Sequence, residues 1–319
     1  MIQAAIIGGG GYTAGELIRI LLYHPKVELA WVHSNSQSGK MISDIHEDLI
    51  GETSLHFTKD MDFDGVDVLF LCSGHGESAR FVNQQQLPEN LVVIDLSQDF
   101  RLDESFVYGL PELHRSQIQG SKRIANCGCF ATAIQLGLLP LAKAGLLQSA
   151  VHITAVTGAT GAGQSPGATT HFSWRNNNLS VYKPFGHQHL AEIKRSLSAL
   201  QGDHLPPLHF IPMRGDFARG IFASMYTQCD LDEEALYELY EQYYQSAPFT
   251  HVIRQNPNLK QVVNTNRALV HLEKHGDQVL ILSLIDNLLK GASGQAVQNM
   301  NLIFQLPEST GLRLKAMVF

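Results

Sequence analysis

The chain has 319 residues, of which 44% are hydrophobic, and a formal net charge of −7. This length predicts two domains or one domain with a large insertion, and the negative charge argues against a general nucleic-acid-binding protein. No apolar run is long enough to predict a membrane span, and no secretion signal precedes the first apolar strand. Four cysteines are too few for a disulfide framework, which favours a reducing cytoplasm.

The N-terminal stretch has the pattern of a strand, a glycine turn and a helix. Residues 4–7 are apolar, residues 8–15 hold five glycines, and an amphipathic helix follows that ends at His24 and Pro25. The spacing of Gly8, Gly11 and Ala14 is a variant of the dinucleotide fingerprint, in which the backbone approaches a pyrophosphate at a helix N-terminus. The candidate cofactor-binding residues of this turn are Gly8, Gly11, Tyr12, Thr13 and Ala14.

The end of the second predicted strand, residues 27–32, indicates which nicotinamide cofactor the turn would hold. An NAD site usually has Asp or Glu there to bind the ribose 2′-OH, and residues 33–36 include neither. Ser34 and Ser36, with Lys40 downstream, leave room for a 2′-phosphate and therefore favour NADP. The alternative is that the two serines only form a turn.

Two further apolar runs, residues 66–72 and 91–96, predict parallel strands that are covered on both faces. Polar residues follow each run, at the sheet edge where ligands of parallel sheets bind. Ser73 after the first run is a candidate cofactor contact. Arg101 after the second is a candidate substrate contact because its guanidinium suits phosphate or carboxylate, although a surface ion pair is an equally good interpretation.

The segment 126–132, with the sequence NCGCFAT, is the centre of the predicted chemistry. Apolar residues at helical spacing follow it, so Cys129 lies at or just before a helix N-terminus. The dipole and unpaired N–H groups there favour a thiolate that can attack a carbonyl carbon. The alternative is that Cys127 and Cys129 are inert, buried residues of a tight turn. Asn126 is a candidate substrate contact in the same segment.

The second half of the chain predicts a different kind of sheet. Its strands are longer and more alternating, which is typical of an antiparallel sheet with one covered face; they span residues 151–156, 208–211, 221–228, 268–272 and 279–285. Helices are predicted at 190–200, 233–244 and 293–304. The predicted fold is therefore an α/β, Rossmann-type parallel-sheet domain (1–128 and 291–319) plus an α+β catalytic and dimerisation domain (129–290).

A histidine-rich helix start supplies the candidate acid–base group. His189 and Glu192 are three residues apart, so a carboxylate can orient the imidazole on one helix face, and a histidine is the expected partner of a nucleophilic thiol. His187 is a candidate substrate contact. The alternative is a zinc site formed by His187 and His189, although no further ligand cluster is evident.

Residues 157–163 form a second glycine loop after a strand, in which Gly161 and Gly163 could let the backbone approach a nicotinamide ring or an acyl group. Taken alone, the loop could be a simple turn. Arg214 is a candidate contact for an anionic substrate. Arg175, Lys183 and Arg219 lie in polar loops of the same predicted domain and could also bind an anionic substrate, and each of the four, taken singly, is more often a solvated surface charge.

The motifs at 8–15, 95–101, 108–112, 126–132, 158–163, 187–193 and 286–295 follow one another in the order seen in the N-acetyl-gamma-glutamyl-phosphate reductase family. This is the arginine-biosynthesis member of the semialdehyde dehydrogenase group, and the chain resembles it over nearly its whole length. The resemblance implies Cys129 as nucleophile, His189 as acid–base group supported by Glu192, and NADP held by the first glycine turn and Asn287.

Two positions depart from the family pattern. Cys127 stands where the family usually has proline. Proline would stiffen the turn and lacks an N–H, so cysteine leaves the turn more flexible and adds a thiol that could be oxidised with Cys129. Asn35 stands where relatives often have arginine, which weakens the case for NADP.

The resemblance implies reduction of an N-acetyl-gamma-glutamyl phosphate by NADPH through a cysteine thioester, with phosphate released and a homodimer or homotetramer as the assembly. The same chemistry on an N-succinyl, aspartyl or aminoadipyl phosphate is a close alternative. A non-catalytic NADP-sensing protein is an alternative of another class. No metal, nucleic acid or membrane partner is expected.

Overall fold

The computed structural model describes residues 1–202 and 204–318, which form two compact units. The first contains Met1–Cys127 and Ala292–Arg313, and the second begins at Gly128, runs to Gly291 and resumes at Leu314. The first unit was predicted to extend to residue 128, one residue beyond Cys127. Its C-terminal part was predicted to begin at residue 291, one residue before Ala292. It also assigned all of 291–319 to the first unit, whereas residues 314–318 belong to the second. Their backbone follows the second unit, where the Met317 N–H donates to the Val263 carbonyl.

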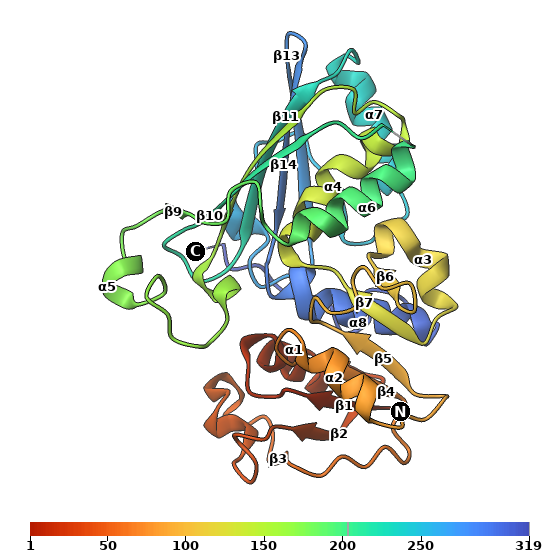
Figure 1. Ribbon diagram of the computed structural model, residues 1–319, viewed down its shortest axis with the longest axis vertical. Helices are drawn as coiled ribbons and strands as arrows, with labels where there is room; N and C mark the ends of the chain where they lie inside the picture. Colours follow the sequence, from red (N-terminus) through yellow and green to blue (C-terminus); the bar gives the residue numbers. More distant parts are fainter. Residues whose placement is uncertain (203, 319) are drawn as a thin grey trace. The chain divides into compact units, whose positions relative to one another are not determined.

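The first unit is built on a seven-stranded sheet with the order β3-β2-β1-β4-β5-β7-β6, in which every neighbouring pair is parallel (Figure 1). Its strands are β1 (Ile2–Ile7), β2 (Val27–His33), β3 (Phe57–Thr58), β4 (Val68–Leu71), β5 (Val92–Asp95), β6 (Val107–Gly109) and β7 (Arg123–Asn126). The central strands β4 and β5 are buried along their whole length, as the continuous apolar runs predict.

Four helices complete the first unit: α1 (Tyr12–Leu22), α2 (Glu77–Gln84), α3 (Pro111–Gln119) and α8 (Gly294–Ile303). Short 3₁₀ turns lie at Ile42–Asp44 and Glu47–Leu49. On one face of the sheet, Leu69, Leu71 and Val93 pack with Ala79 and Val82 of α2. Helix α8 contacts α1 and α3, so the C-terminal piece of the chain is part of this unit.

Buried amide side chains hold α8 in the first unit. Asn299 donates to the Gly109 carbonyl at 3.0 Å and to Asn126 Oδ1 at 3.1 Å. Asn301 Oδ1 lies 3.1 Å from Nε2 of His24, which follows α1, and its amide donates to the carbonyl oxygens of Glu308 and Thr310. Because buried polar groups must be paired, these bonds fix where the helix lies in the unit.

The second unit contains a mixed seven-stranded sheet with the order β12-β13-β14-β11-β8-β10-β9. Its strands are β8 (Val151–Thr157), β9 (Ser180–Val181), β10 (Leu208–Arg214), β11 (Ile221–Gln228), β12 (Thr250–Val252), β13 (Ala268–His275) and β14 (Gln278–Ile285). Two pairs, β8–β10 and β12–β13, are parallel and the others antiparallel, so the predicted, mainly antiparallel sheet is confirmed.

Helices cover one face of this second sheet. They are α4 (Cys129–Lys143), α6 (His189–Gln201) and α7 (Glu233–Tyr244), and the short α5 (Phe172–Arg175) precedes β9. Strand β11 alternates buried residues with half-buried or exposed ones, because one face packs on α4. The hydroxyl groups of Tyr240 and Tyr244 donate to backbone carbonyls of α4, each at 2.6 Å, which fixes α7 against α4. In Figure 1, α4 and α6 lie side by side.

Candidate active site

Cys129 is the first residue of α4, and Gly128 is the N-cap in extended conformation. The predicted helix start is therefore confirmed. The two neighbouring thiols differ: Cys127 is 1% exposed, whereas Cys129 is partly accessible. Cys127 fits the description of a buried residue in a tight turn, because its thiol contacts the Gly109 carbonyl and accepts from Gln295 Nε2 at 2.7 Å. Only Cys129 combines accessibility with a helix N-terminus, which stabilises a thiolate.

Glu192 links the starts of two helices. Its Oε2 accepts a hydrogen bond from the Gly128 N–H at 3.1 Å, and its Oε1 lies 3.9 Å from Nε2 of His189, the first residue of α6. Both side chains are buried. The predicted sharing of one helix face is thus observed, and the same carboxylate also holds the residue immediately before the Cys129 thiol.

His187 stands beside His189 in a group of aromatic rings. The two imidazole centroids are 4.6 Å apart and nearly perpendicular, and Phe130 packs edge-on against His187 at 5.4 Å. His187 Nδ1 also accepts from the His189 backbone N–H at 3.2 Å. His187 is buried, so it fixes the entry into α6. No group of three or more His, Cys, Asp or Glu side chains that could hold a metal ion occurs in the described residues.

Tyr182 and Arg214 form a pair, of which only Arg214 was predicted from the sequence. The Arg214 guanidinium lies 4.5 Å from the centroid of the Tyr182 ring. Burial raises the pKa of the Tyr182 phenol, the negative charge of Cys129 raises it further, and Arg214 lowers it. Arg214 Nε is buried, and among described residues it has no hydrogen-bond partner. A cation with an unused donor therefore belongs to the surroundings of the thiol. Tyr182 was not predicted, because nothing in its local sequence places it near Cys129.

Two other arginines were interpreted as possible surface charges, and that alternative is wrong. Arg175 is buried and donates to backbone carbonyls of Thr169, Asn178 and Arg214. Arg219 forms an ion pair with the fully buried Asp286, from Nε to Oδ2 at 3.1 Å. Lys183, by contrast, is exposed and donates to Gln188 at 3.3 Å.

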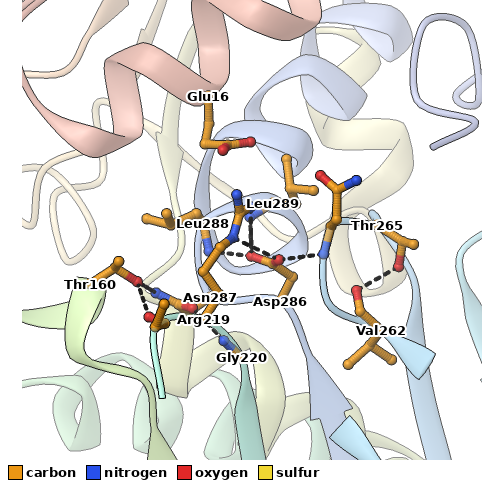
Figure 2. Close-up of polar contacts among 12 residues, drawn as sticks. Glu16, Thr160, Arg219, Gly220, Val262, Thr265, Asp286, Asn287, Leu288 and Leu289 are labelled. Atoms are coloured by element: carbon orange, nitrogen blue, oxygen red, sulfur yellow. Dashed lines mark hydrogen bonds and ion pairs between the residues drawn. The ribbon is translucent and has the colours of Figure 1, made fainter. Parts of the chain in front are cut away.

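Asp286 organises the turn that leads out of β14, as Figure 2 shows. Besides Arg219, its carboxylate accepts from the backbone N–H groups of Leu288 and Leu289 at 2.8 and 3.1 Å. It also accepts from the Asn264 N–H at 2.7 Å. The turn continues into a π-helical segment, Leu289–Ser293. Within it, a Cβ atom on Gly291 would lie 2.8 Å from Cβ of Cys129, so only glycine leaves room for the nucleophile.

Asn287 joins this turn to the second glycine loop. Its Oδ1 accepts from the Gly220 N–H at 2.7 Å, and its Nδ2 donates to Thr160 Oγ1 at 3.0 Å (Figure 2). Thr160 lies in the 3₁₀ turn Ala159–Ala162, which contains Gly161 and ends at Gly163. Gly161 and Gly163 are both exposed. The loop is fixed by long-range contacts within the second unit, because Thr160 Oγ1 accepts from Asn287 and donates to the Ala218 carbonyl.

The first glycine turn has the features of a dinucleotide cradle. Gly8 has φ +82°, and a Cβ there would lie 2.8 Å from the backbone of Cys72 and Ser73. Gly11 is the N-cap of α1, no side chain caps this helix, and its first turn contains no acidic residue. The N–H groups of Tyr12, Thr13 and Ala14 have no acceptor within the helix and can bind a pyrophosphate. These residues fit a nicotinamide dinucleotide.

The residues after β2 form a turn at 35–39, as the alternative interpretation expected. Ser34 is buried, with its Oγ 3.8 Å from the position of a Cβ on Gly10, whereas Ser36 and Lys40 are exposed. Lys40 Nζ donates to Gln37 at 3.0 Å. A turn and a phosphate-binding role are compatible here.

Arg101 and Asn126 come together in the first unit. The Arg101 side chain is buried and donates from Nε to the Asn126 carbonyl at 3.0 Å and from Nη2 to the Leu96 carbonyl at 3.3 Å. The surface ion pair that was the alternative for Arg101 is therefore wrong. Asn126 donates to the Ala292 carbonyl at 3.0 Å. Both residues hold the strand end that leads into residue 127.

Comparison with known proteins agrees with this architecture. Residues 3–121 match the family described as "Semialdehyde dehydrogenase, NAD binding domain", and residues 129–287 match "Semialdehyde dehydrogenase, dimerisation domain". The chain belongs to the semialdehyde dehydrogenase family. It is thus an oxidoreductase that uses a nicotinamide cofactor.

Individual relatives that align over the whole chain carry the name of one reductase within this family. The N-acetyl-gamma-glutamyl-phosphate reductases of Phocaeicola vulgatus and Christiangramia forsetii are each 56% identical over 322 aligned residues, covering 100% of this chain and of each relative. A solved structure of aspartate semialdehyde dehydrogenase II from Vibrio cholerae has a TM-score of 0.75 at 16% identity, covering 96% of this chain and 98% of that one. At that identity, the structural likeness shows the fold alone. Over residues 1–202 and 204–318, no helix is long and apolar enough to cross a membrane.

Proposed function

We propose that this protein reduces N-acetyl-gamma-glutamyl phosphate to N-acetylglutamate semialdehyde with NADPH and releases phosphate. One observation supports this assignment above the others. Glu192 contacts both the backbone N–H immediately before the Cys129 thiol and the imidazole of His189, so nucleophile, acid–base group and carboxylate form one connected set. The relatives that are 55–56% identical over the full chain bear the name of this reductase.

In the first step, the Cys129 thiolate attacks the γ-carbonyl carbon and forms a carbon–sulfur bond. The bond between that carbon and the phosphate oxygen breaks, so phosphate leaves and a thioester remains. The N–H groups of Phe130 and Ala131, in the first turn of α4, have no acceptor within the helix and can stabilise the oxyanion.

His189 holds the proton of the Cys129 thiol and returns it when the aldehyde leaves. Glu192 keeps the imidazole oriented and stabilises its protonated form. When bound, the reduced nicotinamide cofactor supplies the hydride that takes the acyl group to the aldehyde level.

Anionic groups of the substrate require cations and N–H donors. Arg214 is the proposed binding residue for an anionic group of the substrate. Its buried Nε has no hydrogen-bond partner among the described residues, and its guanidinium lies over the Tyr182 ring. Arg101, Asn126 and His187 remain proposed substrate contacts. Arg101 and His187 also have structural hydrogen bonds, so their substitution would affect the local backbone as well as binding.

The cofactor is proposed to lie on the first glycine turn. Gly8, Gly11, Tyr12, Thr13 and Ala14 would hold the pyrophosphate, with Ser73 beside Gly8 and with Gly161, Gly163 and Asn287 toward the nicotinamide. Ser34, Ser36 and Lys40 would bind the 2′-phosphate, which makes NADP the proposed cofactor. The comparison of kcat/KM for NADP and NAD, in the wild type and in Lys40→Ala, tests this preference, because loss of the lysine should reduce only the NADP value.

The proposed assembly is a homodimer or homotetramer formed through the second unit, whose family description is a dimerisation domain. Within the described residues none of the four cysteines forms a disulfide, which supports a reducing cytoplasm as the proposed location. N-succinyl, aspartyl and aminoadipyl phosphates are the alternative substrates, and a non-catalytic NADP sensor is the alternative function.

The deciding experiment follows NADPH formation in the reverse direction from N-acetylglutamate semialdehyde, with and without phosphate, and repeats it with the N-succinyl analogue and aspartate semialdehyde. Phosphate-dependent reduction of NADP with the N-acetyl compound is the expected result. A higher kcat/KM with another semialdehyde would reassign the acyl group. If folded protein binds NADP but reduces it with none of these compounds, the sensor alternative is supported.

A further inference from the structure

His46 is a buried histidine that contacts the first glycine turn from a segment that the mechanism does not use. It lies between the 3₁₀ turns Ile42–Asp44 and Glu47–Leu49, which follow β2, and it is 7% exposed. The His46 N–H donates to the Ile42 carbonyl at 2.9 Å, and the His46 carbonyl accepts from the Leu49 N–H at 2.9 Å. The imidazole is therefore attached to a fixed backbone.

The imidazole is hydrogen-bonded to the glycine turn. Its Nε2 lies 2.7 Å from the Gly9 carbonyl oxygen, and because a carbonyl can only accept, Nε2 carries a proton and donates. The Gly9 N–H donates in turn to the His33 carbonyl at 2.9 Å. A Cβ atom on Gly9 would lie 2.4 Å from the Val32 side chain and 2.9 Å from that of Phe57. Gly9 is thus held at its N–H, at its carbonyl and at its Cα atom.

The same ring also packs against helix α1. A Cβ atom on Gly15 would lie 2.6 Å from His46 Nδ1. Gly15 lies inside α1, where glycine is less favourable than alanine. The imidazole accounts for this glycine, because a larger residue would displace the ring. His46 therefore contacts both the turn before α1 and the helix itself.

The hydrogen bond to Gly9 determines which way one peptide of the turn points. A trans peptide is planar, and its carbonyl and its N–H point in opposite directions. Because the Gly9 carbonyl is bound to His46, the Gly10 N–H points away from the imidazole. Among the described residues this N–H has no hydrogen-bond partner. Like the first N–H groups of α1, it is a donor with a fixed direction that is available to an anion.

We infer that His46 is a positioning residue for the cofactor, because its bond to Gly9 sets the direction in which the turn offers N–H groups to the pyrophosphate. The inference rests on the proposed function, in which the cofactor lies on this turn. NADP and NAD have the same pyrophosphate, so loss of the bond should weaken both equally, whereas Lys40→Ala should weaken NADP alone. Adenosine 2′-monophosphate has no pyrophosphate, so its affinity should not depend on His46.

The test is a calorimetric titration of full-length variants with NADP, NAD and adenosine 2′-monophosphate. His46→Phe keeps a ring but has no donor, whereas His46→Gln can still donate from its amide nitrogen. We expect His46→Phe to raise the Kd of NADP and of NAD about tenfold, the scale of one lost hydrogen bond and of the preorganisation that it provides. The Kd of adenosine 2′-monophosphate should stay the same. His46→Gln should recover most of the lost affinity.

The matched control is His24→Phe. His24 is another buried histidine of the first unit, and its Nε2 lies 3.1 Å from Asn301 Oδ1. The control should lower the urea midpoint without changing the Kd of either dinucleotide. A purely structural role of His46 would make the two Phe variants alike.

Three results would overturn the inference: wild-type affinity for NADP in His46→Phe, a His46→Gln variant as weak as His46→Phe, or a loss confined to NADP. If His46→Phe does not fold, Gly15→Ala is titrated in its place. Its added methyl group displaces the imidazole, so the same loss is expected, and wild-type affinity would again contradict the inference. If the wild type binds NADP but reduces it with no semialdehyde, the proposed function alone fails, because these titrations need no substrate.

Discussion

Two buried carboxylates of the second unit, Asp286 and Glu192, have opposite kinds of surroundings. Asp286 is fully buried and receives three backbone N–H groups and a two-point contact from Arg219. Glu192 is almost as buried, but its partners differ, because its Oε2 accepts from the Gly128 N–H at 3.1 Å and its Oε1 lies 3.9 Å from Nε2 of His189. Asp286 is thus fixed by many short bonds, whereas Glu192 faces a group that can exchange a proton.

The surroundings of a buried carboxylate indicate whether its role is structural or catalytic. A carboxylate whose oxygens are saturated by fixed donors holds a turn in place, and its loss should appear in stability. A carboxylate that touches a titratable ring and a helix N-cap adjusts to changes in charge, and its loss should appear in rate.

The largest effect is expected at the nucleophile itself. Cys129→Ser should lower kcat/KM by roughly 10⁴-fold or more, the scale seen when a catalytic nucleophile is removed, with little change in the urea midpoint. Cys127→Ser is the matched control and should retain most activity. If the Cys127 variant alone is inactive, the wrong thiol has been assigned.

Asp286→Asn should be the most destabilising of these changes. It leaves Arg219 without its buried partner, and removal of one member of a buried pair costs about 3 kcal/mol or more. Urea denaturation followed by circular dichroism measures the loss. The matched control is Glu234→Gln, which breaks the exposed pair with Arg254 and should leave the urea midpoint unchanged. If the Asp286→Asn variant unfolded at the same urea concentration as the wild type, Asp286 would not have the structural role that distinguishes it from Glu192.

Glu192→Gln should give the reverse result. The amide oxygen can still accept from Gly128, so the urea midpoint should stay near the wild type, while kcat falls by about 10²-fold because the imidazole loses its carboxylate. A pH profile of kcat should show an altered acidic limb. A large loss of stability with normal kcat would make Glu192 a structural residue like Asp286.

The smallest effect is expected at Asp232, a third carboxylate, which caps α7. It accepts from the Ala235 N–H at 2.8 Å. Asp232→Ala should cost about 1 kcal/mol of unfolding free energy, the usual value of an N-cap, and should leave kcat unchanged. Equilibrium unfolding and a steady-state assay on the same preparation would check both parts.

The sequence predicted those features that depend on local pattern. The continuous apolar runs identified β4 and β5, and the glycine turn before α1 and the helix start at Cys129 were correct. The short strands β7 and β9 were missed, because β7 (RIAN) lacks the continuous apolar run that identified the equally short β4 and β5, and β9 has only two residues. Helix α3 was also missed, although Pro111 at its first turn is a recognised start signal.

The contacts that were not predicted join residues far apart in the chain. Nothing near Arg219 indicates that its partner is Asp286, 67 positions away. The burial of Arg175 follows from carbonyl groups that its own loop directs inward, which composition cannot reveal. Tyr182 likewise depends on β9 pairing with β10. Local sequence therefore identified the reactive groups, and tertiary structure was needed to identify the residues that position them.

The buried amides of α8 have a practical consequence for dividing this protein into fragments. A gene fragment that stops at residue 127 would encode all seven strands of the first sheet but would leave Asn126 and the Gly109 carbonyl without the Asn299 amide. Such a fragment should be insoluble when expressed alone and should be rescued by co-expression of a peptide spanning 292–313. Fusing that peptide behind residue 127 through a flexible linker should yield an isolated cofactor-binding domain for titration with NADP and NAD.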